Sequence, residues 1–169
     1  EPPFSNLPNP SPGTSYVLQS WNGAASAIRL TTVTGTIPTA TWNTGSAVFP
    51  VGGTAWNSGN LPNSAEQMIE TRKLAANDAS ISSAVMMNGK IWAAHHIAFP
   101  SSGTPTSIDV QWWQLDGASG GGFGVVLQRG RVGSATGQYK WFPGIAVNKN
   151  EDVIIGYSAS SQSTRVSAA

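Results

Sequence analysis

Two Asn-Gly pairs, at positions 22–23 and 88–89, each stand between two short apolar runs. An Asn-Gly pair in this setting is the strongest short-range signal for a β-hairpin, because a type I′ turn needs two residues that tolerate positive φ. The strands predicted on either side of these pairs are 16–21, 27–33, 81–87 and 90–99. These four runs favour a chain built from antiparallel hairpins.

Further short apolar runs, bounded by Gly, Pro, Asn or Ser, continue this pattern and are typical of an all-β protein. The additional strands that we predict are 39–42 and 47–49, which are weak, then 107–115, 125–132, 141–147 and 152–158, and a last strand that begins at Thr164. The runs are joined by predicted loops or turns at 51–63, 100–105, 117–124 and 148–151.

The segment 64–76 has no clear assignment. Ser64 and Gln67 have the spacing of a capping box, and the following residues lack Gly and Pro, so local rules favour a helix. Glu70, Arg72 and Lys73 crowd the face that such a helix would bury, and an extended connection is the alternative.

Composition excludes several classes of function. The 169 residues carry nine basic and eight acidic side chains, for a net charge of +1, which removes the main argument for binding nucleic acid or an anionic membrane surface. No window approaches the roughly 20 apolar residues of a membrane helix. The chain has no cysteine, which excludes disulfides, thiol catalysis and Cys-ligated zinc.

Two segments resemble each other within the chain. Residues 83–95 can be laid on residues 144–157, since each is an apolar strand, an Asn-containing turn and a second apolar strand rich in small residues. The spacing is roughly 60 residues, somewhat above that of common propeller blades, with room for long loops. Repeated antiparallel units of this kind are typical of a β-propeller.

A wider resemblance covers most of residues 77–161. Residues 77–92, the run Trp-Trp-Gln-Leu-Asp at 112–116, and 142–148 continuing through Gly-Tyr-Ser-Ala-Ser-Ser at 156–161 are similar to a group of large secreted bacterial β-propeller proteins. Members of this group are described as sialidase-like by fold and are mostly uncharacterised. The turn glycine of the group is Glu151 here, so we expect Asn150 to take the left-handed position. The group's arginine is Ala79 here, and no Asp-box (Ser-x-Asp-x-Gly-x-x-Trp) occurs, so the resemblance does not imply sialidase activity.

The resemblance implies an all-β partial β-propeller of two to three four-stranded antiparallel blades, and the alternative is a β-sandwich. The predicted divisions are an extended lead-in at 1–13, a partial blade at 14–50, an insertion or connection at 51–80, a full blade at 81–133 and a partial blade at 134–169. A propeller has roughly four to eight blades. We therefore expect the rest to come from a longer parent chain, from other subunits or from self-association.

Candidate ligand-binding residues are few. His95 and His96 are adjacent and point to opposite faces of a strand, so they cannot share one metal ion there. Asp78 precedes a predicted inner strand and is the best candidate for an acid that lines a channel. Trp112 and Trp113 are consecutive, so one of them is a candidate for stacking on a sugar or anchoring a partner. A structural or packing role is the favoured interpretation of each of these residues, and we predict no catalytic residue, metal site or cofactor.

These features lead to two functional hypotheses. The first is a non-enzymatic, extracellular or periplasmic propeller segment that acts as a structural or protein-interaction module within a larger chain or assembly. The alternative is a glycan-binding or glycoside-acting, sialidase-like propeller fragment with a channel lined by Asp78 and by His95 or His96. Neither hypothesis involves nucleic acid or a membrane-spanning segment.

Overall fold

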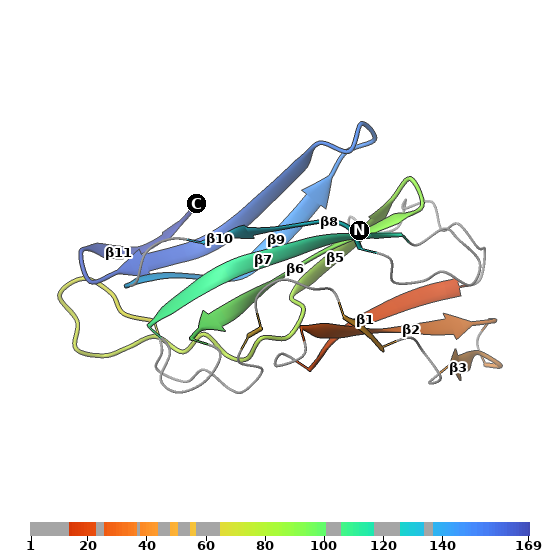
Figure 1. Cartoon of the computed structure of the whole chain (residues 1–169), viewed down its shortest axis with the longest axis horizontal. Helices are drawn as coiled ribbons and strands as arrows, with labels where there is room; N and C mark the ends of the chain where they lie inside the picture. Colours follow the sequence, from red (N-terminus) through yellow and green to blue (C-terminus); the bar gives the residue numbers. More distant parts are fainter. Residues whose placement is uncertain are drawn as a thin grey trace.

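The chain folds from β-strands alone over the residues that the computed structural model describes, which are 14–22, 26–36, 38–43, 48–50, 55–56, 65–100, 106–116, 126–133 and 137–169. Two sheets contain these strands (Figure 1). The strands are β1 (Thr14–Asn22), β2 (Ala27–Thr34), β3 (Thr41–Asn43), β4 (Val48–Pro50), β5 (Ser83–Met87), β6 (Lys90–Phe99), β7 (Ser107–Asp116), β8 (Val126–Val132), β9 (Gln138–Val147), β10 (Val153–Ser161) and β11 (Thr164–Ala168). The all-β class is confirmed. The described strands form neither a closed barrel nor a closed propeller, so the partial propeller stays a prediction.

The smaller sheet contains the first four strands. β1 and β2 form an antiparallel pair, and both β3 and β4 pair with β2, at opposite ends of it. The weak predictions at 39–42 and 47–49 correspond to β3 and β4 within two residues. The predicted lead-in 1–13, most of the insertion 51–63 and the glycine-rich turn 117–124 lie outside the described residues.

The larger sheet consists of two antiparallel meanders. β5, β6, β7 and β8 pair in chain order, and so do β9, β10 and β11. The two meanders are joined into one sheet by a single parallel pair, Ile108 at the start of β7 with Tyr139 of β9. The turn between β5 and β6 has φ values of 51° at Asn88 and 73° at Gly89, so the predicted type I′ turn is confirmed.

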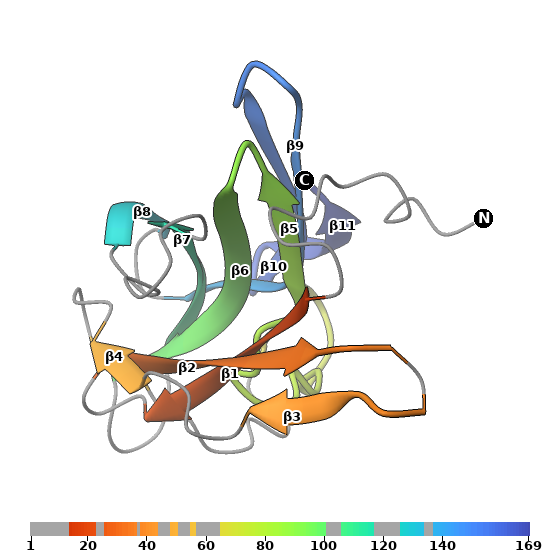
Figure 2. The same cartoon turned by 90° about the vertical axis from the view of Figure 1, so that its right-hand side faces the viewer.

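Strand β6 is buried on both of its faces, from Ile91 to Ala98. Ile91, Ala93 and Ile97 pack with Ile28 and Leu30 of β2 in one hydrophobic cluster. On the opposite face, two further side chains of β6, Trp92 and Ala94, pack against Ile145 of β9. β6 therefore lies between the β1–β2 pair and the β9–β10 hairpin, an arrangement visible in Figure 2. Burial on both faces explains why this strand is apolar along most of its length.

The helix considered for 64–76 is absent over the described residues 65–76. Ala65 and Leu74 instead exchange two backbone hydrogen bonds, of 3.2 and 2.7 Å, and the Met68 N–H donates to the Thr164 carbonyl at 3.1 Å. Ala65 and Ala76 are fully buried in a cluster with Ala98 of β6. The segment turns back on itself between Ala65 and Leu74, which pair antiparallel, and its charged residues would leave a helix little apolar surface to pack. The structure therefore shows neither the helix nor a simple extended connection, but a loop with turns at its centre.

Candidate functional site

His95 lies in the interior between the two sheets. Its side chain is fully buried, its Nδ1 is 2.7 Å from the Ala79 carbonyl oxygen, and its ring contacts Trp56 and Trp113 with centroids 5.1 and 4.7 Å away. Burial lowers the pKa of His95 to about 3, against the ordinary 6.5. At neutral pH the imidazole is uncharged, and its Nδ1–H donates to Ala79.

His96 points to the opposite face of β6. Its side chain is 2% exposed, and its ring meets the edge of Phe142 with centroids 5.6 Å apart. Burial lowers the pKa of His96, while the Ala76 backbone and the Asp78 carboxylate act in the other direction. The β6 backbone therefore separates the two imidazoles, and each is enclosed by different packing.

Asp78 lies in the exposed turn before β5. Its Oδ1 accepts a hydrogen bond from the Ser80 N–H at 3.0 Å, and hydrogen bonding to Ser80 lowers the pKa of this carboxyl. A short acceptor that binds the backbone two residues ahead is a common turn device. Of the other candidate residues, His96 acts on Asp78, because its positive form would lower the pKa of the aspartate slightly further.

The two consecutive tryptophans lie on opposite faces of β7. Trp113 is fully buried, beside Trp56 and His95. Trp112 is half-buried and stacks on Trp92, with ring centroids 6.2 Å apart and planes at 27°. The structure thus brings Trp113 and His95 together on one face of β6, places His96 near enough to Asp78 for their charges to interact, and stacks Trp112 on Trp92. The most exposed tryptophan of the described residues is Trp42, at 53%.

A buried carboxylate on β7 was not predicted as part of any site. Asp109 is 2% exposed, and its Oδ2 lies 3.4 Å from Nε of Arg131 on β8. The Arg131 guanidinium also lies over the ring of Phe99, 4.7 Å from its centroid. These contacts tie the outer strand β8 to β6 and β7. Alternation along 107–115 shows that Asp109 shares a face with Trp113, and from this its burial could have been inferred.

A polar cluster joins the tips of the β5–β6 and β9–β10 hairpins. The two Glu151 carboxylate oxygens lie 2.8 and 2.7 Å from Nζ of Lys90, and they also accept hydrogen bonds from Asn88 at 3.3 Å and Gln114 at 3.4 Å. Asn88 donates a second hydrogen bond to the Lys149 carbonyl at 3.1 Å. Hydrogen bonding to Lys90 holds the pKa of Glu151 below its ordinary value, and hydrogen bonding to Asn88 makes the next largest contribution in the same direction. We call these five residues the hairpin clamp.

The clamp corrects the expectation for the β9–β10 turn. Glu151 itself has φ 67°, and Asn150 does not take the left-handed position. The Asn148 Oδ1 accepts hydrogen bonds from the Asn150 and Asp152 N–H groups at 2.8 and 3.0 Å, which sets the shape of the turn. In this turn the left-handed Glu151 directs its carboxylate to Lys90, a residue distant in sequence.

Two serines join the same hairpins away from their tips. The Ser82 hydroxyl is within hydrogen-bond distance of the Pro143 carbonyl at 3.1 Å, and the Ile145 N–H donates to the Ser83 hydroxyl at 3.2 Å. Each of these two serine contacts links residues 61 or 62 positions apart. The contacts of Asn88 and Lys90 with the β9–β10 turn span 61 to 63 positions. The similarity between residues 83–95 and 144–157 indicated this spacing from the sequence, but it did not show that the two segments are in contact.

These polar clusters join strands, and the described residues contain no group of three or more metal-ligating side chains. Within the same residues, no helix is long and apolar enough to cross a membrane. Comparison with known proteins found no matching family model, no matching curated protein and no matching solved structure.

Proposed function

We propose that this chain is a non-enzymatic structural and protein-interaction module, a segment of an extracellular or periplasmic β-propeller within a larger chain or assembly. The observation that carries the proposal is the set of contacts at a constant sequence offset. Two hairpins in successive meanders touch through residues 61 to 63 positions apart, at their tips and near their bases. Regular stacking of like units gives contacts of this kind.

The order of packing supports the partial propeller. Three units follow one another along the chain, β1–β4, β5–β8 and β9–β11, close to the predicted divisions 14–50, 81–133 and 134–169. The β5–β8 unit is a four-stranded antiparallel meander, which is the form of a propeller blade. One of its faces packs on β1–β2 and the other on β9–β10. Consecutive blades of a propeller also stack face to face, and here the second and third units are in addition joined by the Ile108–Tyr139 pair.

The candidate ligand-binding residues support a structural role over the glycan-binding alternative. A channel that binds a glycan needs accessible polar side chains that converge on one space. His95 and His96 are enclosed on opposite faces of β6, and the Asp78 carboxylate binds its own turn. Trp112 is engaged by Trp92, and Trp113 is in the core. Packing accounts for the two histidines and the two tryptophans, and the hydrogen bond to Ser80 accounts for Asp78.

The location outside the cytoplasm is supported by the composition. Charged residues are 10% of the chain, against an average near 25%, and nineteen glycines favour many turns. These features agree with the resemblance to secreted propeller proteins.

The test is the native mass of material purified from the natural source, together with the intact mass of the chain. We expect this sequence within a much larger polypeptide or in a stable complex. A stable monomer of 17.6 kDa would contradict the proposal.

A further inference from the structure

The β9–β10 hairpin has one bare face. Gly144 and Ala146 of β9 and Ile154 and Gly156 of β10 are exposed, and Ile154 has 71% of its surface accessible. Gly144 pairs directly with Gly156, and Ala146 with Ile154. The result is a surface poor in side chains, with one large aliphatic group. The other face of the same hairpin, carrying Ile145, packs on β6.

The equivalent face of the preceding hairpin is covered. The cross-strand pairs of β5–β6 that correspond to these two pairs are Ser83 with Ala94 and Val85 with Trp92. The offset is 61 residues in the first strand and 62 in the second. Trp92, Ala94 and Val85 form the cluster against which Ile145 packs. In β5–β6, the β9–β10 hairpin covers these positions. The equivalent positions of β9–β10 are exposed.

We propose that the bare face of β9–β10 docks a further β-hairpin, stacked on it as β9–β10 stacks on β5–β6. This inference rests on the proposed function and adds to it the surface and the chemistry of the partner. The docked hairpin presents aliphatic side chains at the positions of Ile145, Val147 and Ile155, which are the groups that pack on β5–β6 in the existing interface. Gly144 and Gly156 offer these side chains a close approach, because neither has a Cβ.

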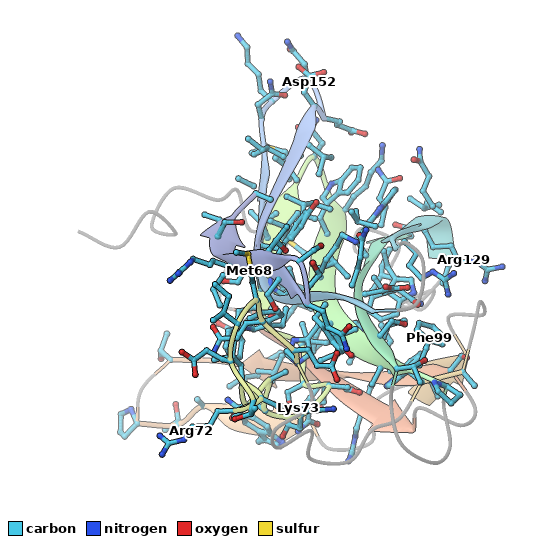
Figure 3. All side chains as sticks on the ribbon, turned by 90° about the vertical axis from the view of Figure 1, so that its left-hand side faces the viewer. Met68, Arg72, Lys73, Phe99, Arg129 and Asp152 are labelled. Atoms are coloured by element: carbon cyan, nitrogen blue, oxygen red, sulfur yellow. The ribbon has the colours of Figure 1, made fainter. Side chains whose placement is uncertain are left out.

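The charge at the hairpin tip specifies the partner further. In the existing interface Lys90, which directly precedes the paired residue Ile91, binds Glu151. The corresponding position before the paired residue Val153 is Asp152, which lies at the tip of the β9–β10 hairpin (Figure 3). The Asp152 Oδ2 accepts a hydrogen bond from Asn148 Nδ2 at 2.8 Å, and its negative charge in place of the lysine favours a basic side chain where Glu151 stands in the present hairpin. A second copy of β9–β10 in the same register would place Glu151 against Asp152, and like charges at this position oppose docking.

The probe for this proposal is a cyclised, fluorescein-labelled peptide that copies residues 138–161 with Glu151→Lys, titrated against the full chain by fluorescence anisotropy. The matched control peptide keeps Glu151. We expect saturable binding, with the lysine peptide bound about threefold to tenfold more tightly, since the pair at the tip changes from repulsive to attractive. On a chain with Asp152→Lys, the preference between the two peptides should reverse.

Two chain variants test whether the peptide binds the proposed face. Ile154→Arg places a charge at its centre and should weaken binding about tenfold or more. The control is Ile69→Arg, since Ile69 is also an exposed isoleucine, at 74%, but lies on the 65–76 segment. This variant should bind like the natural chain.

Three results would overturn the proposal: no saturable binding of either peptide up to about 1 mM, equal binding to the Ile154→Arg and natural chains, or an unchanged charge preference on the Asp152→Lys chain. Each of these results leaves the proposed function to be judged separately by native mass. A large native mass with no binding to this face would retain the structural module and reject this docking surface.

Discussion

Acidification is expected to destabilise the chain, because His95 is buried as a neutral imidazole. Its pKa falls from 6.5 to about 3 on folding, since burial disfavours the charged ring. Between these two values the unfolded chain binds a proton that the folded chain does not bind. The stabilisation is therefore complete above pH 6.5 and is lost as the pH falls toward 3.

The size of the effect follows from this difference in proton binding. The free energy of unfolding falls by about 1.4 kcal/mol for each pH unit below the unfolded pKa. From neutral pH to about pH 5 the loss from His95 is therefore about 2 kcal/mol. Any folded pKa below about 4 gives nearly the same figure at this pH. His96 adds a loss of the same sign, because burial also lowers its pKa.

The assay is urea denaturation at about pH 7.5 and about pH 5 for the natural chain and for His95→Asn. Asparagine keeps a donor for the Ala79 carbonyl and removes the titrating ring. Glu66, Asp78 and Glu151 have lowered pKa values, so their stabilising effect is lost mainly below their ordinary values of 4.5 and 3.8 and affects both chains alike. We expect the natural chain to lose about 2 kcal/mol more than His95→Asn. Equal losses would refute the assignment of His95 as a buried neutral group.

Three further substitutions test separate contacts. Glu151→Gly should have a higher Tm by circular dichroism than Glu151→Ala, because both lose the carboxylate but only alanine keeps a side chain at φ 67°; an equal or lower Tm for the glycine variant contradicts this. Gly130→Ala would place a Cβ 2.7 to 2.8 Å from the Trp112 ring, so we expect the free energy of unfolding to fall by about 1–3 kcal/mol. The near-UV circular dichroism of the Trp92–Trp112 pair should change as well. An unchanged spectrum and stability would show that the indole is not held over Gly130. Ile28→Ala should cost about 2–5 kcal/mol in urea denaturation, since Ile28 is fully buried in the core; a cost below about 1 kcal/mol would mean that β2 does not pack on β6.

The strands could be predicted because their signals are local. The turn at Asn88-Gly89 needs only two residues with positive φ, and the register of β5–β6 follows directly from it. The same holds for β7, whose period-two pattern matches its observed bounds within a residue. Such features depend on neighbours in the chain, which the sequence displays.

The features that could not be predicted depend on distant partners. The segment 65–76 is a loop rather than a helix, and it is placed by the hydrogen bond from Met68 to Thr164 and by the packing of Ala65 near Ala98. The left-handed Glu151 binds Lys90, which lies 61 residues away in the sequence. Local propensity has no access to either contact. The candidate residue His95 was placed on the correct strand, but its enclosure depends on Trp56, which lies in a segment predicted as a loop.

The most direct test of stacking between the two hairpins is zero-length carbodiimide coupling, followed by peptide mapping. This reagent joins an amine to a carboxylate only when the two are in contact, and the Lys90 Nζ and Glu151 Oε2 atoms are 2.7 Å apart. The pair Lys73–Glu66, at 2.9 Å, lies within one short segment and serves as the positive control. We predict both the Lys90–Glu151 and the Lys73–Glu66 cross-links. A product with the Lys73–Glu66 cross-link but without the Lys90–Glu151 cross-link would contradict the stacked hairpins on which the account depends.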